Sequence, residues 1–275
     1  MTFAVGALLP EYVVTARMPA ELSENKIHED GLARQLGFRG GLVPGVTVYA
    51  WMTHPVVAAF GRAWLERGRF SVRFTRPVYF DERVTVRSRA AERSGDTITL
   101  DSEVVNAAGE TCATGNMSLP DHAPPAPDVG AYPAAALPAE RPLVSREVLE
   151  SRTVLGTPEL LLDEAAVKAF LGRVNESLPL YDVPDGLAHP GLYLDQANRA
   201  LSRNVRVSPW IHVESHGQHL GPARVGERIE TRGRVARLFD RKGHELVELD
   251  LLLVVGGRPV AKVQHVAIYR LRGSA

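Results

Sequence analysis

Hydrophobic and polar residues alternate along eight stretches of the chain, four in each half. A period of two places successive side chains on opposite faces of a strand, so it predicts β-strands with one buried face. Turn residues at Ser94-Gly95-Asp96 and at 106–109 connect neighbouring stretches in the first half, which favours antiparallel hairpins. The predicted strands are residues 69–74, 83–90, 97–105, 111–119, 210–217, 227–237, 245–255 and 261–270.

A helix is predicted ahead of each set of strands. Residues 46–60 and 192–204 lack the alternation, and a Pro-Gly pair precedes each of them. Proline is tolerated at the start of a helix because its missing N–H would have no partner there, and glycine permits close backbone approach. A long helix followed by an antiparallel meander indicates α+β modules in which one sheet wraps around one helix.

The two halves are copies of one module. Residues 76–91 return as residues 221–236, so that Pro77 corresponds to Pro222 and Glu82 to Glu227. This period is much longer than the roughly 20–50 residues of solenoid repeats, so each copy is a domain-sized unit and the pair is a fused dimer. The predicted organisation is an N-terminal module at 1–119, a Pro- and Ala-rich linker at 120–142 and a C-terminal module at 143–275.

Composition argues against two classes of partner. The chain has 275 residues with 32 Lys and Arg against 32 Asp and Glu, so no net charge attracts nucleic acid or an anionic membrane. Its 45% of hydrophobic residues is enough for two ordinary cores. No signal peptide opens the chain, no apolar run approaches the roughly 18 residues of a membrane span, and Cys112 has no partner for an internal disulfide. We therefore expect a cytoplasmic protein that binds neither nucleic acid nor membranes.

Short motifs in the first half resemble those of a known enzyme family. In chain order they are Asn25-Lys26-Ile27-His28, Ala33 with Gly37-Phe38, Leu42-Val43-Pro44-Gly45, and Phe74-Thr75-Arg76-Pro77-Val78. This order is similar to the MaoC-like acyl dehydratases and (R)-specific enoyl-CoA hydratases of the hotdog superfamily. Residues 210–213 and 265–269 resemble double-hotdog members of that group, so the resemblance covers nearly the whole chain.

The resemblance implies a fold and a reaction. The fold is a double hotdog, in which each antiparallel sheet wraps a central helix. The reaction is hydration or dehydration of trans-2-enoyl or 3-hydroxyacyl thioesters of CoA or an acyl carrier protein, with no metal or other cofactor. Adding water across the double bond needs a carboxylate and an imidazole that share one water molecule. It also needs backbone N–H groups at the thioester oxygen, where negative charge builds up.

His28 is the expected acid/base group. Counting back five residues, the catalytic Asp of the family corresponds to Ser23, whose hydroxyl lacks the standing charge of a carboxylate. Glu24 is a carboxylate one residue out of register, and such a shift normally turns a side chain to the other side of an extended segment. The candidate catalytic residues are therefore His28, Ser23 and Glu24, with Glu24 acting only after a local rearrangement of the loop.

The start of the first predicted helix is the candidate oxyanion site. Pro44 has no N–H, so the amides of Gly45 and Val46 are the expected donors. The candidate substrate-binding residues are Asn25 in the catalytic loop, Tyr49 and Trp51 in the acyl tunnel, and His189 at the start of the second helix.

The second half is expected to be a non-catalytic partner that shapes the acyl or pantetheine tunnel. Glu176 stands at its Asp position and Tyr181 at its His position. A phenol with a pKa of about 10 is a poor base at neutral pH.

Two further patterns have simpler explanations. His212, Glu214 and His216 would share one face of a strand and could bind zinc, but no distant Cys or His accompanies them, so no metal is expected. Arginines on the predicted strands could bind CoA phosphates, although a solvated sheet face has the same pattern. They are Arg73, Arg76, Arg87, Arg224, Arg232 and Arg234.

Two other functions remain open. A non-catalytic protein that binds acyl-CoA, or a partner subunit, would explain Ser23 directly. A hotdog thioesterase would need a carboxylate on the central helix; residues 45–60 contain none, whereas the second helix contains Asp195 and Gln196. The sequence also leaves open the acyl chain length, the choice between CoA and carrier protein, and whether the two-module chain forms a homodimer.

Overall fold

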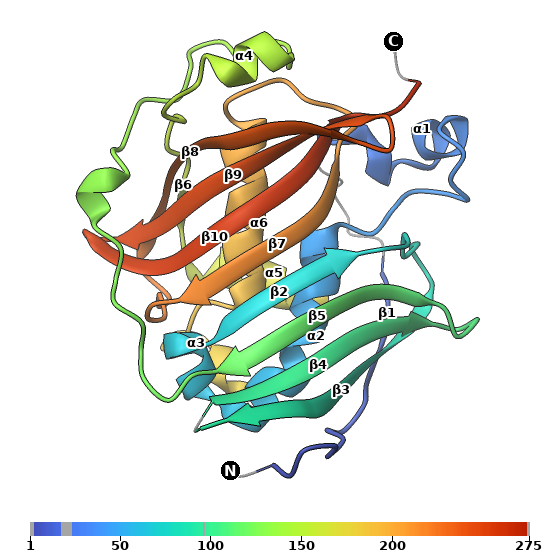
Figure 1. Ribbon diagram of the computed structural model, residues 1–275, viewed down its shortest axis with the longest axis vertical. Helices are drawn as coiled ribbons and strands as arrows, with labels where there is room; N and C mark the ends of the chain where they lie inside the picture. Colours follow the sequence, from blue (N-terminus) through green and yellow to red (C-terminus); the bar gives the residue numbers. More distant parts are fainter. Residues whose placement is uncertain (1–2, 18–23, 96, 274–275) are drawn as a thin grey trace.

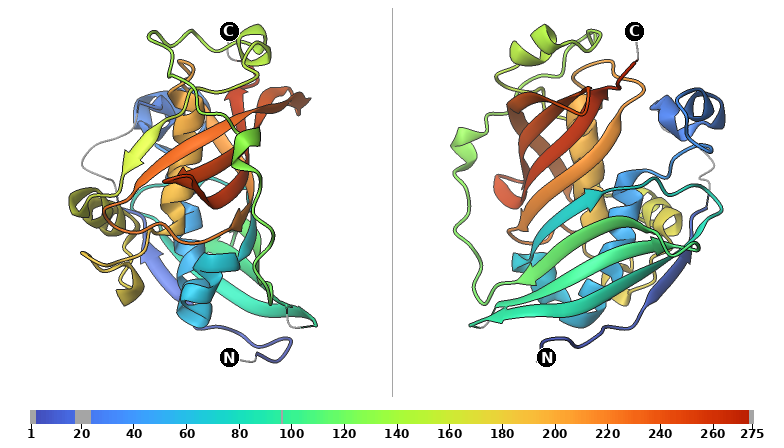
Figure 2. Two further views of the ribbon diagram at one scale, coloured as in Figure 1. Left: turned by 90° about the vertical axis from the view of Figure 1, so that its left-hand side faces the viewer. Right: turned by 45° about the vertical axis from the view of Figure 1, so that its right-hand side comes forward.

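The computed structural model describes residues 3–17, 24–95 and 97–273. Within these residues, strands from both halves form one antiparallel sheet, and each half of the sheet curves around a long helix (Figure 1, Figure 2). None of the helices described is long and apolar enough to cross a membrane.

In the first half, the sheet wraps around helix α2 (Gly45–Phe60), which is apolar along most of its length and buried on nearly all sides. A helix inside a curved sheet has no solvent face, so it needs no polar stripe. The strands are β1 (Tyr12–Thr15), β2 (Arg69–Phe74), β3 (Arg83–Ser94), β4 (Thr97–Asn106) and β5 (Thr111–Leu119). Short helices η1 (Lys26–His28), α1 (Asp30–Gln35) and α3 (Arg62–Arg67) flank α2 in the sequence.

The second half has the same plan around helix α6 (Pro190–Ser202). Its strands are β6 (Glu159–Leu161), β7 (Ile211–His219), β8 (Arg228–Arg241), β9 (His244–Val255) and β10 (Arg258–Arg270). Helices α4 (Arg146–Glu150), α5 (Glu164–Val174) and η3 (Pro179–Tyr181) precede α6, and η2 (Val129–Ala131) lies in the connection between the halves.

The strand order shows the internal symmetry of the sheet. It runs β1-β3-β4-β5-β2-β7-β10-β9-β8-β6, so the second half repeats the first in reverse. The halves join where β2 pairs with β7, with Arg69 opposite Gln218 and Arg73 opposite Glu214. This pairing satisfies two strand edges that would otherwise be open. Gly45 and Gly191 both lie in the first turn of their central helices, as the sequence repeat predicts.

The predicted α+β arrangement is confirmed, and each predicted strand is present with ends that differ by a few residues. The prediction missed β1 and β6, because strands of three or four residues are too short to show a period. It also missed α5, although the signals were present: Asp163 caps the first turn, and Val167, Phe170 and Val174 follow at helical spacing.

The connection between the halves packs on the outer face of the second sheet. Tyr132 is buried there against Leu252 and Val254, and its hydroxyl donates to the carboxylate of Asp250 at 3.0 Å. The connection thereby covers apolar residues of β9 that face away from α6.

Candidate functional site

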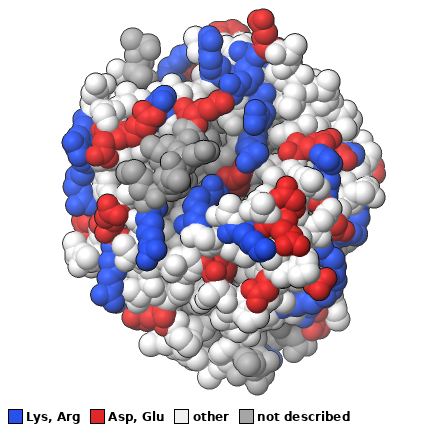
Figure 3. Space-filling model, turned by 180° about the vertical axis from the view of Figure 1, so that it is seen from behind, with Lys and Arg blue, Asp and Glu red and all other residues white. Residues whose placement is uncertain are grey.

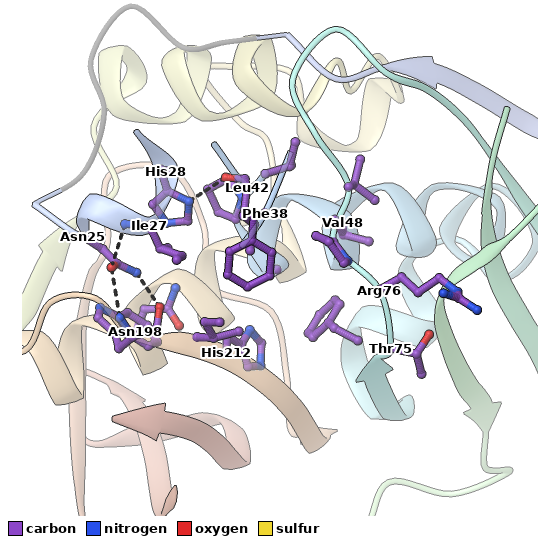
Figure 4. Close-up of a pocket in the computed structure, with 18 residues that line it drawn as sticks. Asn25, Ile27, His28, Phe38, Leu42, Val48, Thr75, Arg76, Asn198 and His212 are labelled. Carbon is purple, nitrogen blue, oxygen red and sulfur yellow. Dashed lines mark hydrogen bonds between the residues drawn. The ribbon is translucent and has the colours of Figure 1, made fainter. Parts of the chain in front are cut away.

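A cavity of about 160 Å³ lies between the two halves at the start of α2 (Figure 4). It is bounded by the η1 loop, the first turns of α2, the end of β2 and the start of β7. Its walls are mostly apolar, as is usual for sites that hold a small organic group. The polar side chains that reach it are Asn25, His28, Thr75, Arg76, Asn198 and His212.

Asn25 fastens the η1 loop to the second half. Its Nδ2 donates to the carbonyl of Trp210 at 2.8 Å, and its Oδ1 accepts from the Trp210 amide at 3.2 Å. The same Oδ1 caps η1 by accepting from the Ile27 amide at 3.4 Å. Because Asn25 is only 6% exposed, these bonds are made away from water, where leaving them unmade would be costly. They fix the position of His28, one turn later.

His28 presents an unprotonated nitrogen. Its Nδ1 lies 2.6 Å from the carbonyl oxygen of Leu42. A carbonyl only accepts, so Nδ1 carries the proton and Nε2 has the free lone pair. Burial lowers the pKa of His28, and the bond to Leu42 opposes this only in part. The imidazole is therefore neutral at neutral pH and can act as a base.

The start of α2 offers free amide groups. The N-cap residue Pro44 makes no side-chain cap, and bonds to its carbonyl begin with the amides of Thr47 and Val48 at 2.9 and 3.2 Å. The amides of Gly45 and Val46 precede the helical bonding pattern and, among the residues described, have no acceptor, so they are available to an oxygen atom.

The start of α6 differs, because it is capped by its own side chain. His189 Nδ1 accepts from the Gly191 amide at 3.0 Å. Two helix starts that correspond in the repeat have thus diverged, and the start of α2 is the one open to a ligand.

A larger groove, about 540 Å³ in volume, continues from the cavity. The two share Asn25, His28, Val43, Pro44, Asn198 and Trp210, so His28 lies where they meet. Arginines outnumber acids on its walls, and Figure 3 shows basic side chains gathered around a hollow on the helix side of the molecule. The charged lining residues are Arg17, Arg141, Arg173, Arg199, Arg203 and Arg206, against Glu24 and Asp195.

The two acids neutralise only part of this charge. Asp195 lies 3.2 Å from Arg199 and 3.7 Å from Arg173, and Glu24 lies 2.8 Å from Arg141. Within the described part of the chain, the remaining arginines make no ion pair; they are Arg17, Arg203 and Arg206. Such guanidinium groups suit phosphate oxygens.

The second half contains a closed counterpart of the site. The Glu176 carboxylate, 2% exposed, accepts from His54 Nδ1 at 2.9 Å and lies 3.5 Å from His189 Nε2. Burial raises the pKa of Glu176, but the contacts with His189 and His54 together outweigh this effect. The net pKa is lowered, so the carboxylate is ionised. Tyr181 is buried beside them, with its ring 4.7 Å from that of His189. Its partners enclose this carboxylate, so it is closed off from solvent.

The structure gathers several of the predicted site residues. His28, Asn25 and Gly45 line the cavity, and Val46 lines the groove. Glu24 is 73% exposed at its side chain, and its pKa is lowered mainly by the hydrogen bond from Arg141. Ser23 lies outside the described residues.

The side chains of Tyr49, Trp51 and His189 lie away from the cavity. The face of α2 that lines it carries Gly45 and Val48, which are three positions apart. Tyr49 instead packs on Phe70 of β2 at 4.8 Å, and the Trp51 indole donates to the Val174 carbonyl at 3.0 Å. His189, as described, is buried against Glu176. These side chains are therefore interior packing residues in this structure.

The predicted common face of His212, Glu214 and His216 is wrong. Consecutive residues Val266 and Ala267 of β10 pair with Glu214 and His212, which leaves Val213 as the extra residue of a β-bulge. The bulge turns His212 inward, whereas Glu214 and His216 pair at 2.8 Å near the surface. Among the residues described, no three His, Cys, Asp or Glu side chains are placed to hold a metal ion.

The basic residues of the groove were missed by sequence reasoning. Five of the six strand arginines considered for phosphate binding instead pair with carboxylates; these are Arg73, Arg76, Arg87, Arg232 and Arg234. Arg199, Arg203 and Arg206 lie four and three positions apart at and just after the end of α6, but Arg17, Arg141 and Arg173 come from distant segments, and nothing in the sequence groups these with the others.

Comparisons with known proteins identify the fold. No family model matches the sequence, and no curated protein is significantly similar to it. A conserved hypothetical protein of Mycobacterium tuberculosis with a double-hotdog fold superposes with a TM-score of 0.69 at 14% identity, over 97% of this chain and 96% of that one. A Chloroflexus aurantiacus protein described as a MaoC domain dehydratase gives 0.62 at 12% identity, over 98% and 97% of the chains. A Lactobacillus plantarum protein described as an oleoyl thioesterase gives 0.58 at 11%, over 97% and 98%.

These likenesses span nearly the whole chain, and at such low identities they establish the architecture. The chain has the double-hotdog fold that its motifs predicted, a fold that it shares with solved structures described as MaoC-like dehydratases and as thioesterases.

Proposed function

We propose that the protein binds acyl thioesters at the start of α2 and hydrates or dehydrates them there. The observation that carries this proposal is that His28, with its unprotonated nitrogen, and the uncapped helix start at Gly45 and Val46 line one mostly apolar cavity and the groove that joins it. A neutral imidazole can take a proton from water, and free amides at a helix start stabilise an oxygen that becomes negative. The fold shared with MaoC-like dehydratases supports this choice of reaction.

The steps balance with His28 as the single proton carrier. In hydration, Nε2 takes a proton from water while the hydroxyl oxygen bonds to the β-carbon of the enoyl thioester. The electrons of the double bond move to the thioester oxygen, which the two amides stabilise. The enolate then collapses, and its α-carbon takes the proton back from His28. Dehydration is the same sequence reversed.

The groove supports CoA as the carrier of the acyl group. CoA bears phosphates at one end and the thioester at the other, and a ligand that follows the groove into the cavity passes His28. Arg17, Arg203 and Arg206, which make no ion pair with a described residue, would bind the phosphates. Arg203→Glu combined with Arg206→Glu should therefore weaken binding of crotonyl-CoA but not of crotonyl-pantetheine, which lacks the phosphates. Arg234→Glu, on a strand of the sheet, is the matched control. Equal loss for both thioesters would contradict the assignment.

The size of the cavity favours a short acyl group. Its volume of about 160 Å³ is below the roughly 300–1,000 Å³ of typical ligand sites, and the groove must hold the rest of the molecule. Crotonyl-CoA is therefore the first substrate to test.

Binding without turnover is the second candidate function. No carboxylate lines the cavity among the described residues, and Glu24 is engaged with Arg141. A thioesterase would depend on Asp195 in the groove, but Arg199 and Arg173 hold that carboxylate, and Gln196 is fully buried.

One assay separates these functions. Wild type, His28→Gln and Ser23→Asp are incubated with crotonyl-CoA and longer enoyl-CoAs, and the product and its chirality are determined. The proposal predicts slow hydration by the wild type, a loss of about 10²–10⁴-fold in His28→Gln, and a gain when Ser23→Asp restores a carboxylate. Binding without product in all three would favour the binding protein, and release of free CoA would favour the thioesterase.

A further inference from the structure

A chain of three side chains leads from the cavity into the sheet of the second half. His212 Nε2 lies 2.8 Å from Ser215 Oγ, and Ser215 Oγ lies 3.0 Å from His265 Nδ1. The bulge at Val213 makes this chain, because it turns His212 and Ser215 to the same inner side of β7. His212 lines the cavity, whereas Ser215 and His265 lie behind it, both fully buried.

Both imidazoles in this chain are neutral. Burial, followed by the neighbouring His265 ring, lowers the pKa of His212 well below its usual value, and burial lowers the pKa of His265 to about 3. A neutral imidazole has one N–H, and a serine hydroxyl has one proton. Ser215 can therefore donate to only one of its two neighbours, which gives two arrangements in which the hydroxyl proton of Ser215 is bonded within the chain.

The two arrangements differ in where one N–H remains without a partner. If Ser215 donates to His212, then His265 Nδ1 donates to Ser215 and the remaining N–H is on His212 Nδ1. If His212 donates to Ser215, the remaining N–H is on His265 Nε2. By distance and angle, neither of these two nitrogens has a hydrogen-bond partner among the residues that the structure describes, although a backbone contact with Glu214 acts to raise the pKa of His212. Only the first arrangement gives the N–H to the residue that lines the cavity, where a ligand can accept it.

His212 Nδ1 faces the start of α2. A Cβ atom built on Gly45 would lie 3.0 Å from this nitrogen and 3.1 Å from the Phe74 ring. Phe74 also packs edge-on against His212 with 4.8 Å between the ring centroids, which restricts rotation of the imidazole. The missing side chain of Gly45 thus leaves His212 next to the amides of the candidate oxyanion site.

We propose that His212 donates a hydrogen bond from Nδ1 to the carbonyl oxygen of the bound thioester, and that Ser215 and His265 hold it in the required tautomer. This inference rests on the proposed acyl-thioester site and adds a third donor to the amides of Gly45 and Val46. No proton is transferred, because the group acts as a fixed, neutral donor aimed at an oxygen that gains charge during the reaction.

The test uses butyryl-CoA labelled with ¹³C at its carbonyl, because this ligand has no double bond to hydrate. Isotope-edited infrared spectra should show a lower carbonyl stretching frequency on the full-length wild type than in solution. In His212→Phe this shift should become smaller, because only the amides of Gly45 and Val46 remain as donors, and Kd should rise about 2- to 10-fold, the effect of one neutral hydrogen bond. Ser215→Ala should show an intermediate shift. His216→Phe, a histidine change on the same strand that faces outward, is the matched control and should match the wild type.

The outcomes separate this inference from the proposed reaction. A shift that depends on His212 without hydration of crotonyl-CoA supports the donor and rejects the hydratase. Hydration with a shift that is unchanged in His212→Phe keeps the hydratase and overturns the donor. Failure of butyryl-CoA to bind the wild type overturns both.

If His212→Phe does not fold, the wild type labelled with [¹⁵N]histidine decides the question. Its NMR spectrum with butyryl-CoA should show the His212 proton on Nδ1, and a proton on Nε2 would overturn the proposal.

Discussion

Replacing Gly45 with alanine should block the candidate oxyanion site while the protein still folds. The new Cβ would lie 3.0 Å from His212 Nδ1 and 3.1 Å from Phe74 Cε2, closer than the about 3.5–4.0 Å of favourable contact between carbon atoms. Such overpacking costs about 1–3 kcal/mol, and alanine recovers about 0.5–1 kcal/mol relative to glycine in a helix. We expect the free energy of unfolding to fall by about 0–2.5 kcal/mol, which a urea titration measures.

The effect of Gly45→Ala on ligand binding should be larger. If the methyl group keeps the thioester oxygen from the two amides, about 1–3 kcal/mol of binding is lost, which is roughly 5- to 150-fold in Kd for butyryl-CoA. Isothermal titration calorimetry measures this change. Gly172→Ala in α5 is the matched control, because a Cβ there meets no atom within 4 Å. The affinity of this variant for butyryl-CoA should equal that of the wild type. A folded Gly45→Ala protein with wild-type affinity and hydration rate would refute the assignment of the ligand oxygen to this helix start.

Three further changes test the account. Asn25→Ala removes both hydrogen bonds to Trp210, so urea titration should show a loss of about 1–3 kcal/mol; unchanged stability would mean that Asn25 does not fasten the loop. Because burial lowers the pKa of His28 from 6.5, kcat/KM for hydration should fall as the pH decreases, with its midpoint below pH 6.5; a midpoint above this pH would contradict His28 as the base. Burial lowers the pKa of His265 from 6.5 to about 3, so as the pH falls this histidine is protonated in the unfolded chain before it is protonated in the folded one. The contribution of neutral His265 to the free energy of unfolding is therefore complete above pH 6.5 and is lost as the pH falls. At about pH 5 this loss is about 2 kcal/mol relative to neutral pH. Urea titrations at about pH 5 and about pH 7 should therefore show a larger loss of stability in the wild type than in His265→Leu. An identical pH dependence of the two proteins would disprove it.

Much of the fold could be predicted because its signals are periodic. Alternation along β3, β4 and β5 gives strands whose inner residues, such as Val84, Val86 and Leu100, are buried against α2. The repeat of residues 76–91 as 221–236 gives the internal symmetry without any structural information.

The candidate site was predicted less completely, because its geometry depends on register and on distant segments. The bulge at Val213 decides that His212 faces the cavity, and an extra residue in a strand leaves no mark in the sequence pattern. Asn25 could be placed beside His28, but its bonds to Trp210 join residues that are 185 positions apart. Tyr49 and Trp51 were expected in a tunnel because both lie on the central helix, although an enclosed helix sends side chains in every direction.

Divergence of the two halves explains why one site was kept open. In the second half, His189 caps its helix and contacts Glu176, so the polar groups satisfy each other in the interior. In the first half, Pro44 leaves the helix start without a side-chain cap, and the imidazole of His28 is bonded only through Nδ1 among the contacts described. Binding a ligand in the first half therefore breaks fewer hydrogen bonds within the protein than binding one in the second half would.

The most direct test of the central claim compares His28→Gln with Glu176→Gln, because these residues occupy the open and the closed site. Each variant is assayed for binding and hydration of crotonyl-CoA after its folding has been checked by circular dichroism. The account predicts that His28→Gln binds the thioester but loses about 10²–10⁴-fold in hydration rate, whereas Glu176→Gln hydrates it at a rate close to that of the wild type. Hydration that survives in His28→Gln and is lost in a folded Glu176→Gln protein would place the chemistry in the second half and contradict the account.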